Sequence, residues 1–289
     1  MFAAPFEYVK AQSWAEAVDY LEEQGDEARP LAGGQSLVPM MVMQMAKPAF
    51  LIDVQGAAPR ALSEVDGRLI APALARHREI AESGLVRANL PALAEAAQFI
   101  GNIRVRSRGT IGGSLAHGDA AAELPVATVA LQAQVTVLGP GGERVIDAVD
   151  LFLGHFETSL SPDEVITDIS FPLPPLRSSS AFAEFTRRPG DYAVVAAAAS
   201  ITLDAASNLD AGRLVLGAIS DRPLDVSEFL TGMPATIEGI RSASHTIAAK
   251  VQIGNSDHGS AIYVRELVQT TAEEALATAL GRASKENQR

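Results

Sequence analysis

The sequence predicts an α+β protein built from three consecutive modules. Residues 1–57 combine one capped helix with short apolar strands, which is the pattern of a small β-α-β unit. Residues 58–175 contain helical stretches and a β-hairpin. Residues 176–289 start after a proline-rich linker and show three strand patterns followed by two helical ones. This segregation of strands and helices is typical of α+β organisation.

The first module contains the clearest helix of the chain, predicted over residues 13–25. Ser13 can cap the helix, Glu16 three residues later fits a capping box, and Gly25 can end it. Its apolar side chains recur at helical spacing. The rest of the module is predicted as a strand, a helix and a buried strand, at residues 28–32, from residue 36 onward, and at residues 49–54.

The second and third modules follow from periodicity and turn residues. The second is predicted to contain helices, a hairpin closed by GPGG and a long strand, at residues 90–101, 123–134, 134–148 and 164–173. The stretch PLPPLRSSS, residues 172–180, is the best linker of the chain. The third module is predicted to contain three strands and two helices, at residues 180–188, 192–204, 213–220, 233–250 and 259–281.

Composition excludes several classes of function. A net charge of −12 disfavours binding to nucleic acid, which needs clustered Lys and Arg. With 47% hydrophobic residues and no apolar run of about 20 residues, the chain is expected to be globular without a membrane span. The absence of cysteine excludes disulfides and thiolate-bound clusters, and the histidines lack metal-ligand spacing. With no leader peptide recognised, a cytoplasmic location is expected.

One local exception to the acidic balance is the segment IRVRSRG. Arg104, Arg106 and Arg108 alternate, which would place them on one face of an extended segment. Such a face suits either a solvated strand edge or the support of a nearby anionic ligand.

Two glycine pairs carry the strongest functional signal. AGGQSL (32–37) and TIGGS (110–114) each place two glycines after an apolar segment and before a serine. Glycine allows a sharp turn and a close approach of backbone N–H groups to a phosphate. A helix that starts directly afterwards favours negative charge at its N-terminus. Because neither GxGxxG nor Gly-Lys-Ser/Thr occurs, the pattern predicts a dinucleotide diphosphate held from two sides in a non-Rossmann manner.

Three stretches together resemble a known family. AGGQSLVPMM, RVRSRGTIGGSLAHGDAAAELP and SAFAEFTRRPGDYAVVAAAAS are similar to the FAD-binding medium subunit of molybdenum hydroxylases, the carbon monoxide dehydrogenase and xanthine dehydrogenase group. The resemblance covers nearly the whole chain. It implies a two-part FAD-binding α/β module, of the vanillyl-alcohol-oxidase/PCMH type, followed by a C-terminal domain with a three-stranded antiparallel sheet and helices.

The resemblance also implies which residues bind FAD. The pyrophosphate would lie between the two glycine segments, the flavin near apolar residues and a tyrosine loop, and the nucleotide portion near an acidic residue. The residues so implied are Ala32, Gly33, Gly34, Gln35, Ser36, Leu37, Ile100, Thr110, Ile111, Gly112, Gly113, Ser114, Glu123, Ile166 and Tyr192. His117 is equally suited to contact the FAD phosphates or ribose and to bond backbone. No residue is expected to be catalytic, and no metal site is expected.

The chain departs from the family pattern at three points. Ser114 stands where Asn or Asp is common, and Glu123 replaces the usual Asp. Some relatives carry a lysine on the strand before the tyrosine loop, whereas SAFAEF has none. This last departure would remove a charged contact to the flavin ring.

The implied function is electron transfer. Electrons would reach FAD from iron–sulfur clusters on a small partner subunit and leave to an external acceptor, while a large subunit carries the molybdenum cofactor. The assembly would be a dimer of heterotrimers. The alternatives are a self-contained flavoenzyme and a partner-binding scaffold that has lost FAD.

Overall fold

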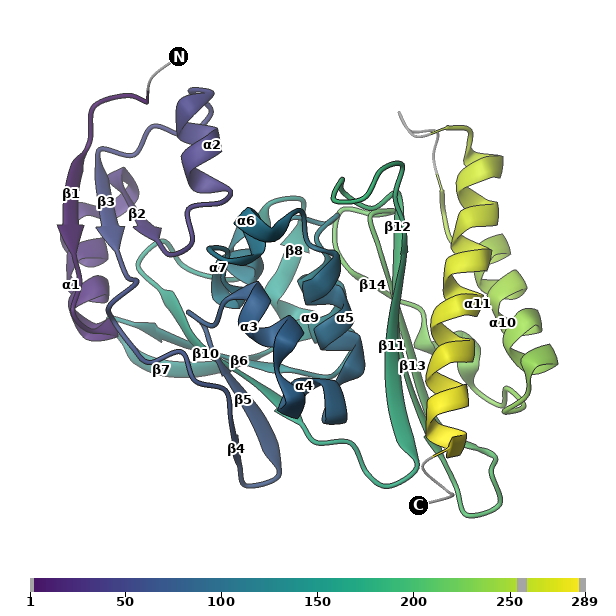
Figure 1. Ribbon diagram of the computed structural model, residues 1–289. Coiled ribbons are helices and arrows are strands. Elements are labelled where there is room, and N and C mark those ends of the chain that lie inside the picture. Colours follow the sequence, from purple (N-terminus) through teal and green to yellow (C-terminus); the bar gives the residue numbers. More distant parts are fainter. Residues whose placement is uncertain (1–2, 254–258, 286–289) are drawn as a thin grey trace.

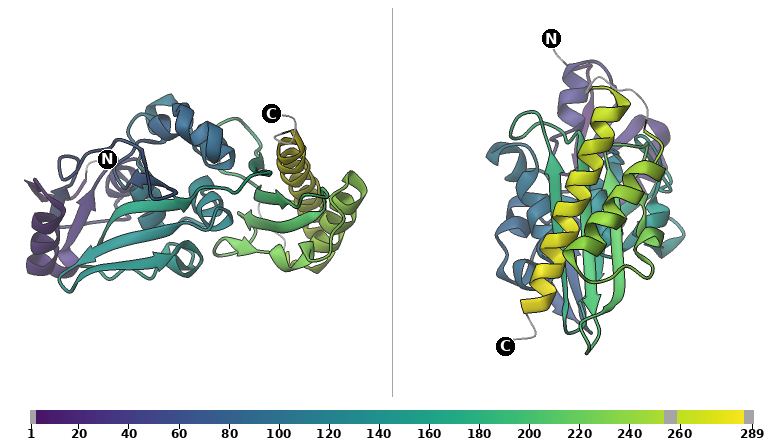
Figure 2. Two further views of the ribbon diagram at one scale, coloured as in Figure 1. Left: turned by 90° about the horizontal axis from the view of Figure 1, so that it is seen from below. Right: turned by 90° about the vertical axis from the view of Figure 1, so that its right-hand side faces the viewer.

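The computed structural model describes residues 3–253 and 259–285, and it confirms the α+β class. Within these residues the strands form three main sheets and one small hairpin sheet. The main sheets follow one another along the chain and lie in a row, as Figures 1 and 2 show. The predicted module boundaries after residues 57 and 175 stay predictions.

The first sheet is parallel and has the order β1-β3-β2. Its strands are β1 (Glu7–Lys10), β2 (Ala28–Leu31) and β3 (Phe50–Asp53). Its helical elements are α1 (Trp14–Gln24), the 3-10 turn η1 (Gly25–Glu27) and α2 (Leu37–Val42). This arrangement confirms the β-α-β reading, because parallel neighbours need crossover connections.

Helix α1 starts and ends where the sequence predicts. Ser13 Oγ accepts a hydrogen bond from the Glu16 N–H at 3.1 Å, and Glu16 accepts one from the Gln12 N–H at 2.7 Å. Gly25 ends the helix with a φ of 55°, a conformation that glycine adopts at low cost. The buried face of α1 therefore packs onto the first sheet with both helix ends capped.

The second sheet is antiparallel, with the order β4-β5-β10-β6-β7. Its strands are β4 (Ser63–Val65), β5 (Arg68–Pro72), β6 (Gln134–Gly139), β7 (Gly142–Asp147) and β10 (Val165–Pro172). The helices inserted between β5 and β6 are α3 (His77–Glu82), α4 (Gly84–Asn89), α5 (Pro91–Phe99), α6 (Ile103–Arg106), α7 (Ile111–His117) and α8 (Glu123–Ala130). After β7 come α9 (Ala148–Leu151) and a hairpin of β8 (Phe152–Gly154) and β9 (Glu157–Thr158).

The prediction of an extended arginine segment was wrong. Residues 103–106 form the short helix α6, because Asn102 Oδ1 accepts hydrogen bonds from the N–H groups of Arg104 and Val105. Arg106 turns back and donates to the carbonyl oxygens of Ile100 and Gly101. The three arginines therefore do not share one strand face.

The C-terminal sheet is antiparallel and has four strands where three were expected. Its strands are β11 (Ser178–Phe185), β12 (Val195–Leu203), β13 (Leu209–Gly217) and the short β14 (Leu224–Asp225). The helical elements that follow are the 3-10 turn η2 (Ser227–Leu230), α10 (Ile237–Lys250) and α11 (Ala261–Lys285). The serines of the expected linker, Ser178, Ser179 and Ser180, instead begin β11 and are buried.

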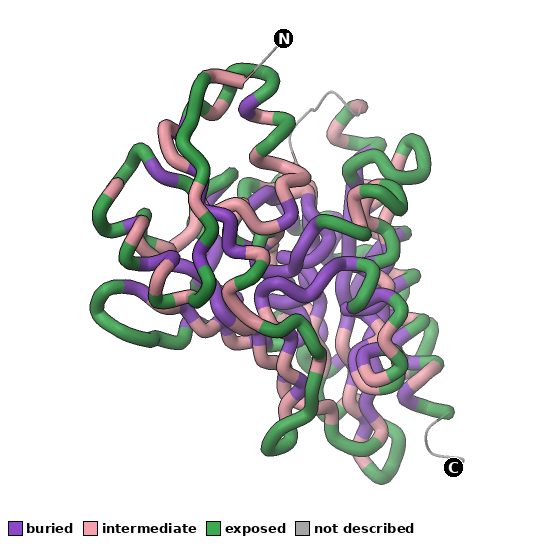
Figure 3. Tube along the Cα trace, turned by 60° about the vertical axis from the view of Figure 1, so that its left-hand side comes forward, coloured by how far each residue is buried: buried purple, intermediate pink, exposed green. Residues whose placement is uncertain are grey.

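Helices cover both faces of this sheet. Alternate residues of β12 belong to two different apolar cores: Ala196 and Ala198 join the core of the second module, while Ala197 and Ala199 join the core beneath α10 and α11. Figure 3 shows the buried stretches gathered in the interior, with exposed chain at the loop tips. The C-terminal sheet is therefore a shared wall between two layers of helices.

A polar network joins the layers across this wall. Glu95 of α5 accepts a hydrogen bond from the Phe182 N–H at 2.9 Å and pairs with Arg282 of α11. Arg282 also donates to the Ser180 carbonyl oxygen at 2.8 Å. Because these groups connect α5, β11 and α11, they fix the C-terminal sheet against the second module.

Among the described residues, no helix is both long enough and apolar enough to cross a bilayer.

Candidate functional site

The two glycine segments lie against each other. A Cβ built on Gly33 would come within 2.4 Å of the Arg108 carbonyl oxygen and 2.7 Å of the Gly109 Cα. No side chain fits at that distance. The first segment can therefore contact the backbone that leads into the second segment only with glycine at position 33. Figure 1 shows α6 and α7 between the first sheet and the C-terminal sheet, where this contact lies.

The first segment presents a run of unpaired backbone donors. Within the described part of the chain, the N–H groups of residues 33–37 have no hydrogen-bond acceptor. Gly34 has a φ of 68°, and Gln35 folds back to donate to the Gly33 carbonyl oxygen at 3.1 Å. Ser36 caps α2 without a side-chain hydrogen bond, and Leu37 is its first residue. Consecutive free N–H groups in a turn are suited to an anion, so these residues fit a diphosphate.

The second segment differs from the predicted nest. The N–H groups of Ile111 and Gly112 donate to the carbonyl oxygens of Ala75 and Ala73, and those of Gly113 and Ser114 donate to Thr110. Four of its five backbone N–H groups are therefore already paired. Its glycines serve packing, since a Cβ on Gly112 would meet the Ala73 Cβ at 2.5 Å. Among the described residues, the donors that this segment still offers a ligand are the Thr110 N–H and the hydroxyl groups of Thr110 and Ser114.

Two buried residues that the sequence analysis did not single out support the second segment. Arg76 donates to the Arg108 carbonyl oxygen and, at 3.1 Å, to Gln55, which follows β3. The ring of His77 lies against Gly109, where a Cβ would approach within 2.5 Å, and its Nδ1 has no hydrogen-bond partner. Burial, with the charges of Arg76 and Arg106, lowers the pKa of His77 to about 4. Glu79, which accepts a hydrogen bond from the Arg76 N–H at 2.8 Å and so caps the start of α3, was the sequence signal that could have indicated this part of the site.

The tyrosine loop reaches the second module next to Ile100. A Cβ on Gly190 would lie 3.0 Å from the Gly101 carbonyl oxygen, so the loop rests on the turn that follows Ile100. Nearby, the rings of Phe99 and Phe182 lie 5.9 Å apart. Tyr192 has 60% of its surface exposed, whereas Ile100 is half-buried. The structure therefore brings two of the predicted flavin neighbours to one place.

Two carboxyl groups, those of Asp119 and Glu123, affect the pKa of the Tyr192 hydroxyl. Burial, the charge of Asp119, a hydrogen bond to Asp119 and the charge of Glu123 raise the pKa of Tyr192 to about 12. Burial also raises the pKa of Glu123 to about 8, with further effect from the charges of Glu184 and Asp119. Burial alone raises the pKa of Glu184 to about 7. The ring of Tyr192 is thus exposed, and its hydroxyl end lies near acidic side chains.

Asp119 precedes helix α8 but does not cap it. Helix α8 begins at Glu123, and its N-cap position is Ala122. Asp119 instead accepts a hydrogen bond from the Ala121 N–H at 2.9 Å and faces Tyr192. No sequence signal indicated the loop of residues 118–122, which places the start of α8 at Glu123.

The remaining predicted residues occupy different surroundings. His117 ends α7, and its ring lies 4.9 Å from that of Phe156, which in turn lies 4.1 Å from that of His155. Burial lowers the pKa of His117, which favours its neutral form. Ile166 is buried in the core of the second module, and Ala32 packs partly against the core of the first. The role of each toward a ligand stays a prediction.

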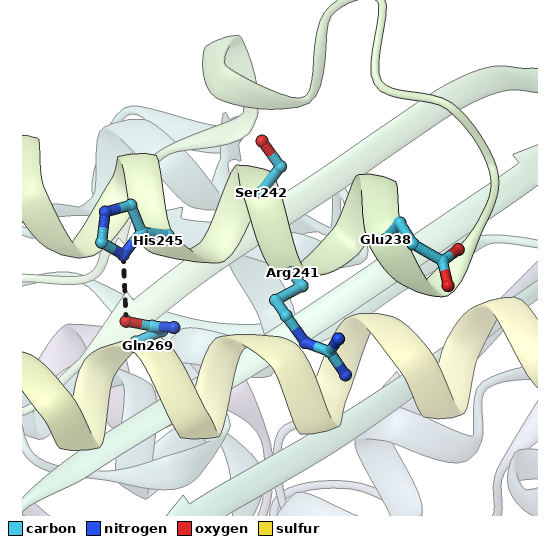
Figure 4. A pocket seen from close by; sticks show the side chains of 5 residues that line it. All are labelled: Glu238, Arg241, Ser242, His245 and Gln269. Carbon is cyan, nitrogen blue, oxygen red and sulfur yellow. Dashed lines mark hydrogen bonds between the residues drawn. The ribbon is translucent and has the colours of Figure 1, made fainter.

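A separate shallow groove of about 400 Å³ lies on the C-terminal helices. Figure 4 shows its lining side chains along α10 and α11, with His245 bonded to Gln269 at 3.4 Å. Arg241 pairs with Glu273 at 3.4 Å. This groove lies beyond the C-terminal sheet from the glycine segments. Over the described residues, no cluster of three or more acidic or histidine side chains could hold a metal ion.

Two family models match consecutive parts of the chain. A model described as the FAD binding domain in molybdopterin dehydrogenase matches residues 4–174. A model described as the CO dehydrogenase flavoprotein C-terminal domain matches residues 180–279.

Similar proteins match over nearly their whole length. The 6-hydroxypseudooxynicotine dehydrogenase complex subunit alpha of Paenarthrobacter nicotinovorans is 39% identical, covering 96% of this chain and 95% of that protein. The carbon monoxide dehydrogenase medium chain of Hydrogenophaga pseudoflava is 32% identical, covering 98% and 99%.

Solved structures agree with these matches. A structure of the Hydrogenophaga pseudoflava carbon monoxide dehydrogenase, which lacks the Mo-pyranopterin moiety of its cofactor, superimposes with a TM-score of 0.92 at 31% identity, covering 98% and 99% of the two chains. Quinoline 2-oxidoreductase from Pseudomonas putida 86 gives a TM-score of 0.90 at 30% identity with the same coverage.

Proposed function

Because the chain belongs to the family of FAD-binding domains in molybdopterin dehydrogenases, we propose that it is the electron-transfer subunit of a molybdenum hydroxylase. It would take electrons from iron–sulfur clusters on a partner chain and pass them to an external acceptor. Its relatives are subunits of dehydrogenase complexes, and the chain is accordingly an oxidoreductase subunit.

The run of free backbone N–H groups at residues 33–37 is the observation that supports this proposal most directly. These donors would hold the pyrophosphate of FAD, and the hydroxyl groups of Thr110 and Ser114 would donate from the opposite side. Because Gly33 leaves no side chain between the segments, the diphosphate can approach both of them. Arg76 and His77 act as positioning residues, since they fix the carbonyl oxygen of Arg108 and the Cα of Gly109.

The flavin end of the cofactor would lie by Ile100 and the exposed ring of Tyr192. When bound, FAD supplies the redox chemistry, and the protein supplies binding, orientation and electrostatics. Tyr192 would cover one edge of the ring system, while Asp119 holds the tyrosine hydroxyl in place. Glu123, His117 and Ile166 are the further residues proposed to lie near the cofactor. Some relatives carry a lysine on this strand, whereas β11 has none, so no lysine of β11 would contact the ring.

The proposed partners are a large molybdenum-binding subunit and a small iron–sulfur subunit, in a dimer of heterotrimers. A chain without cysteine cannot hold iron–sulfur clusters by thiolates, so the clusters would be on the small subunit. The proposed location is the cytoplasm. The arginines of α6 and of the tyrosine loop are proposed as part of the docking surface.

Two measurements test the proposal. The full chain, purified and mixed with FAD, should show the visible absorbance of a bound flavin at one equivalent. Affinity capture of the tagged chain from its native host should then recover chains that carry molybdenum and iron, as measured by elemental analysis. A chain that binds no FAD would support the scaffold alternative. Substrate turnover by the chain alone, free of molybdenum and iron, would support the self-contained flavoenzyme.

A further inference from the structure

Helix α5 is held against strand β11 at three points along its length. Near the start of the helix, the Ala92 N–H donates to Ser180 Oγ at 3.2 Å. About one helical turn later, Glu95 accepts a hydrogen bond from the Phe182 N–H at 2.9 Å. At the end of the helix, the ring of Phe99 lies 5.9 Å from that of Phe182. These contacts set the register between the helix and the strand along the whole of α5.

The middle contact holds the backbone of β11 and not one of its side chains. β11 is an edge strand of the C-terminal sheet, and Figure 1 shows it between α5 and α11. On its open edge, Glu95 accepts the hydrogen bond from the Phe182 N–H. Arg282 of α11 pairs with Glu95 and donates to the Ser180 carbonyl oxygen at 2.8 Å. The ion pair thus binds backbone groups that a further strand would otherwise pair with, so a displacement of the pair would displace the strand itself.

The two elements that Glu95 joins lead to the two predicted neighbours of the flavin. Helix α5 continues directly into Ile100. Strand β11 continues into the loop that carries Tyr192. The base of this loop is closed by a hydrogen bond from the Val194 N–H to the Phe185 carbonyl oxygen at 2.8 Å. A shift of α5 against β11 would therefore change the separation between Ile100 and the tyrosine loop.

We propose that Glu95 is a positioning residue for the flavin end of the cofactor site. Held by Arg282, it sets the separation between Ile100 and the Tyr192 loop, and so the surroundings and the reoxidation rate of the flavin. Because its carboxylate is engaged by Phe182 and Arg282, Glu95 acts through the elements that it joins and not on the reacting atoms. The inference rests on the proposed function, because it requires a flavin between Ile100 and Tyr192.

Another ion pair of the same sheet provides the matched control. Arg213 of β13 and Asp225 of β14 lie 2.9 Å apart, and their side chains are 30% and 24% exposed. The corresponding values are 37% for Arg282 and 26% for Glu95. Among the described residues, neither Arg213 nor Asp225 bonds to α5 or β11. If loosening the sheet were enough to change the flavin surroundings, the loss of either pair would have the same effect.

The first test uses the full chain without FAD and follows hydrogen exchange at the Val194 amide, at the base of the tyrosine loop. Glu95→Ala should raise this exchange rate by at least about tenfold over wild type, because the strand that leads into the loop is released. Arg282→Lys keeps the charge but loses the planar guanidinium, so its increase should be smaller. Arg213→Ala should leave the rate unchanged. Equal rates in wild type and Glu95→Ala would overturn the inference.

The second test observes the flavin in chains loaded with FAD, which are reduced with dithionite and reoxidised by oxygen. A displacement of about 1 Å can change the rate at a reacting centre by about a hundredfold, so Glu95→Ala should change the reoxidation rate by at least about threefold. It should also shift the visible absorption spectrum. Arg282→Lys should show the same changes to a smaller extent, and Arg213→Ala should match wild type. The affinity for ADP, which carries the diphosphate without a flavin, should be the same in all four proteins.

The outcomes separate the inference from the proposed function. Equal spectra and reoxidation rates in wild type and Glu95→Ala, or equal changes in Glu95→Ala and Arg213→Ala, would overturn the inference while leaving FAD binding intact. If Glu95→Ala does not fold, the comparison of Arg282→Lys with Arg213→Ala decides in the same way. A wild-type chain that binds no FAD would overturn the proposed function itself, and the inference with it.

Discussion

The carbonyl oxygen of Arg108 lies 2.4 Å from the position that a Cβ on Gly33 would occupy. These two residues set how closely the two glycine segments approach each other. Because the neighbour is backbone and is held by Arg76, it cannot move aside as a flexible side chain would.

Gly33→Ala should therefore force the segments apart. We expect a loss of stability of about 1–3 kcal/mol, as for other overpacked sites, and at least a tenfold loss of FAD affinity. Thermal unfolding and a flavin titration measure the two effects. The matched control is Gly141→Ala, whose Cβ would meet nothing within 4 Å. Unchanged affinity in Gly33→Ala would show that the segments do not close on the cofactor.

Tyr192→Ala should change the flavin surroundings without preventing binding. The loop rests on Gly101 and would stay in place, whereas the exposed ring and its bond to Asp119 would be lost. We expect a shifted flavin absorption spectrum and a changed reoxidation rate. Tyr192→Phe, which keeps the ring, is the control and should retain the spectrum. Identical spectra for all three proteins would remove Tyr192 from the site.

Alkaline pH should destabilise the chain without FAD through Glu123 and Glu184. Their pKa values of about 8 and about 7 in the folded protein exceed the ordinary value of 4.5. The folded state thus binds more protons than the unfolded state, so this stability is present at low pH and is lost as pH rises through about 8. Denaturant unfolding should show a decline of a few kcal/mol from about pH 5 to about pH 9.

The double variant Glu123→Gln/Glu184→Gln serves as the reference for that measurement. It should show a flatter dependence than wild type over the same range, because neither glutamine titrates. Parallel curves for the two proteins would mean that both carboxyl groups ionise freely in the folded state.

Arg282→Ala should loosen the C-terminal sheet. It removes the partner of Glu95 and leaves a carboxylate inside the boundary between the layers. We expect a loss of about 1–3 kcal/mol and faster hydrogen exchange at the Phe182 amide, which bonds to Glu95. The control is Arg78→Ala, whose pair with Glu82 is exposed on both sides and should matter little. Unaltered exchange at Phe182 would show that Glu95 holds its place without Arg282.

The elements predicted best from the sequence were those with local signals. Ser13, Glu16 and Gly25 mark the ends of α1 within the sequence itself, and the GPGG turn marks the β6–β7 hairpin. The glycine pairs predicted a close approach of backbone to a phosphate, which stays a prediction; the structure shows a different close approach, between Gly33 and the Arg108–Gly109 backbone.

The errors arose where a distant contact or a single cap decided the outcome. Asn102 turned an alternating arginine segment into helix α6. Ser180 looked like linker but is buried, because its hydroxyl accepts a hydrogen bond from the Ala92 N–H of α5. The partners of Glu95, at Phe182 and Arg282, come from other parts of the chain, so no local pattern could predict them. The backbone hydrogen bonds from TIGGS to Ala73 and Ala75 also could not be predicted, because these partners are distant in the sequence.

The alanine run of β12 lies between two layers of helices, so its side chains limit how closely the layers approach each other. Ala196 and Ala198 face one helical layer, and Ala197 and Ala199 face the other, so one short strand sets the thickness of the whole sandwich. A single added methyl group on this strand would press against one of the two layers. Such a change would shift the second module relative to α10 and α11 without altering any residue of the glycine segments. Sequence variation in this strand can therefore change the geometry of the subunit at a distance from its predicted cofactor site.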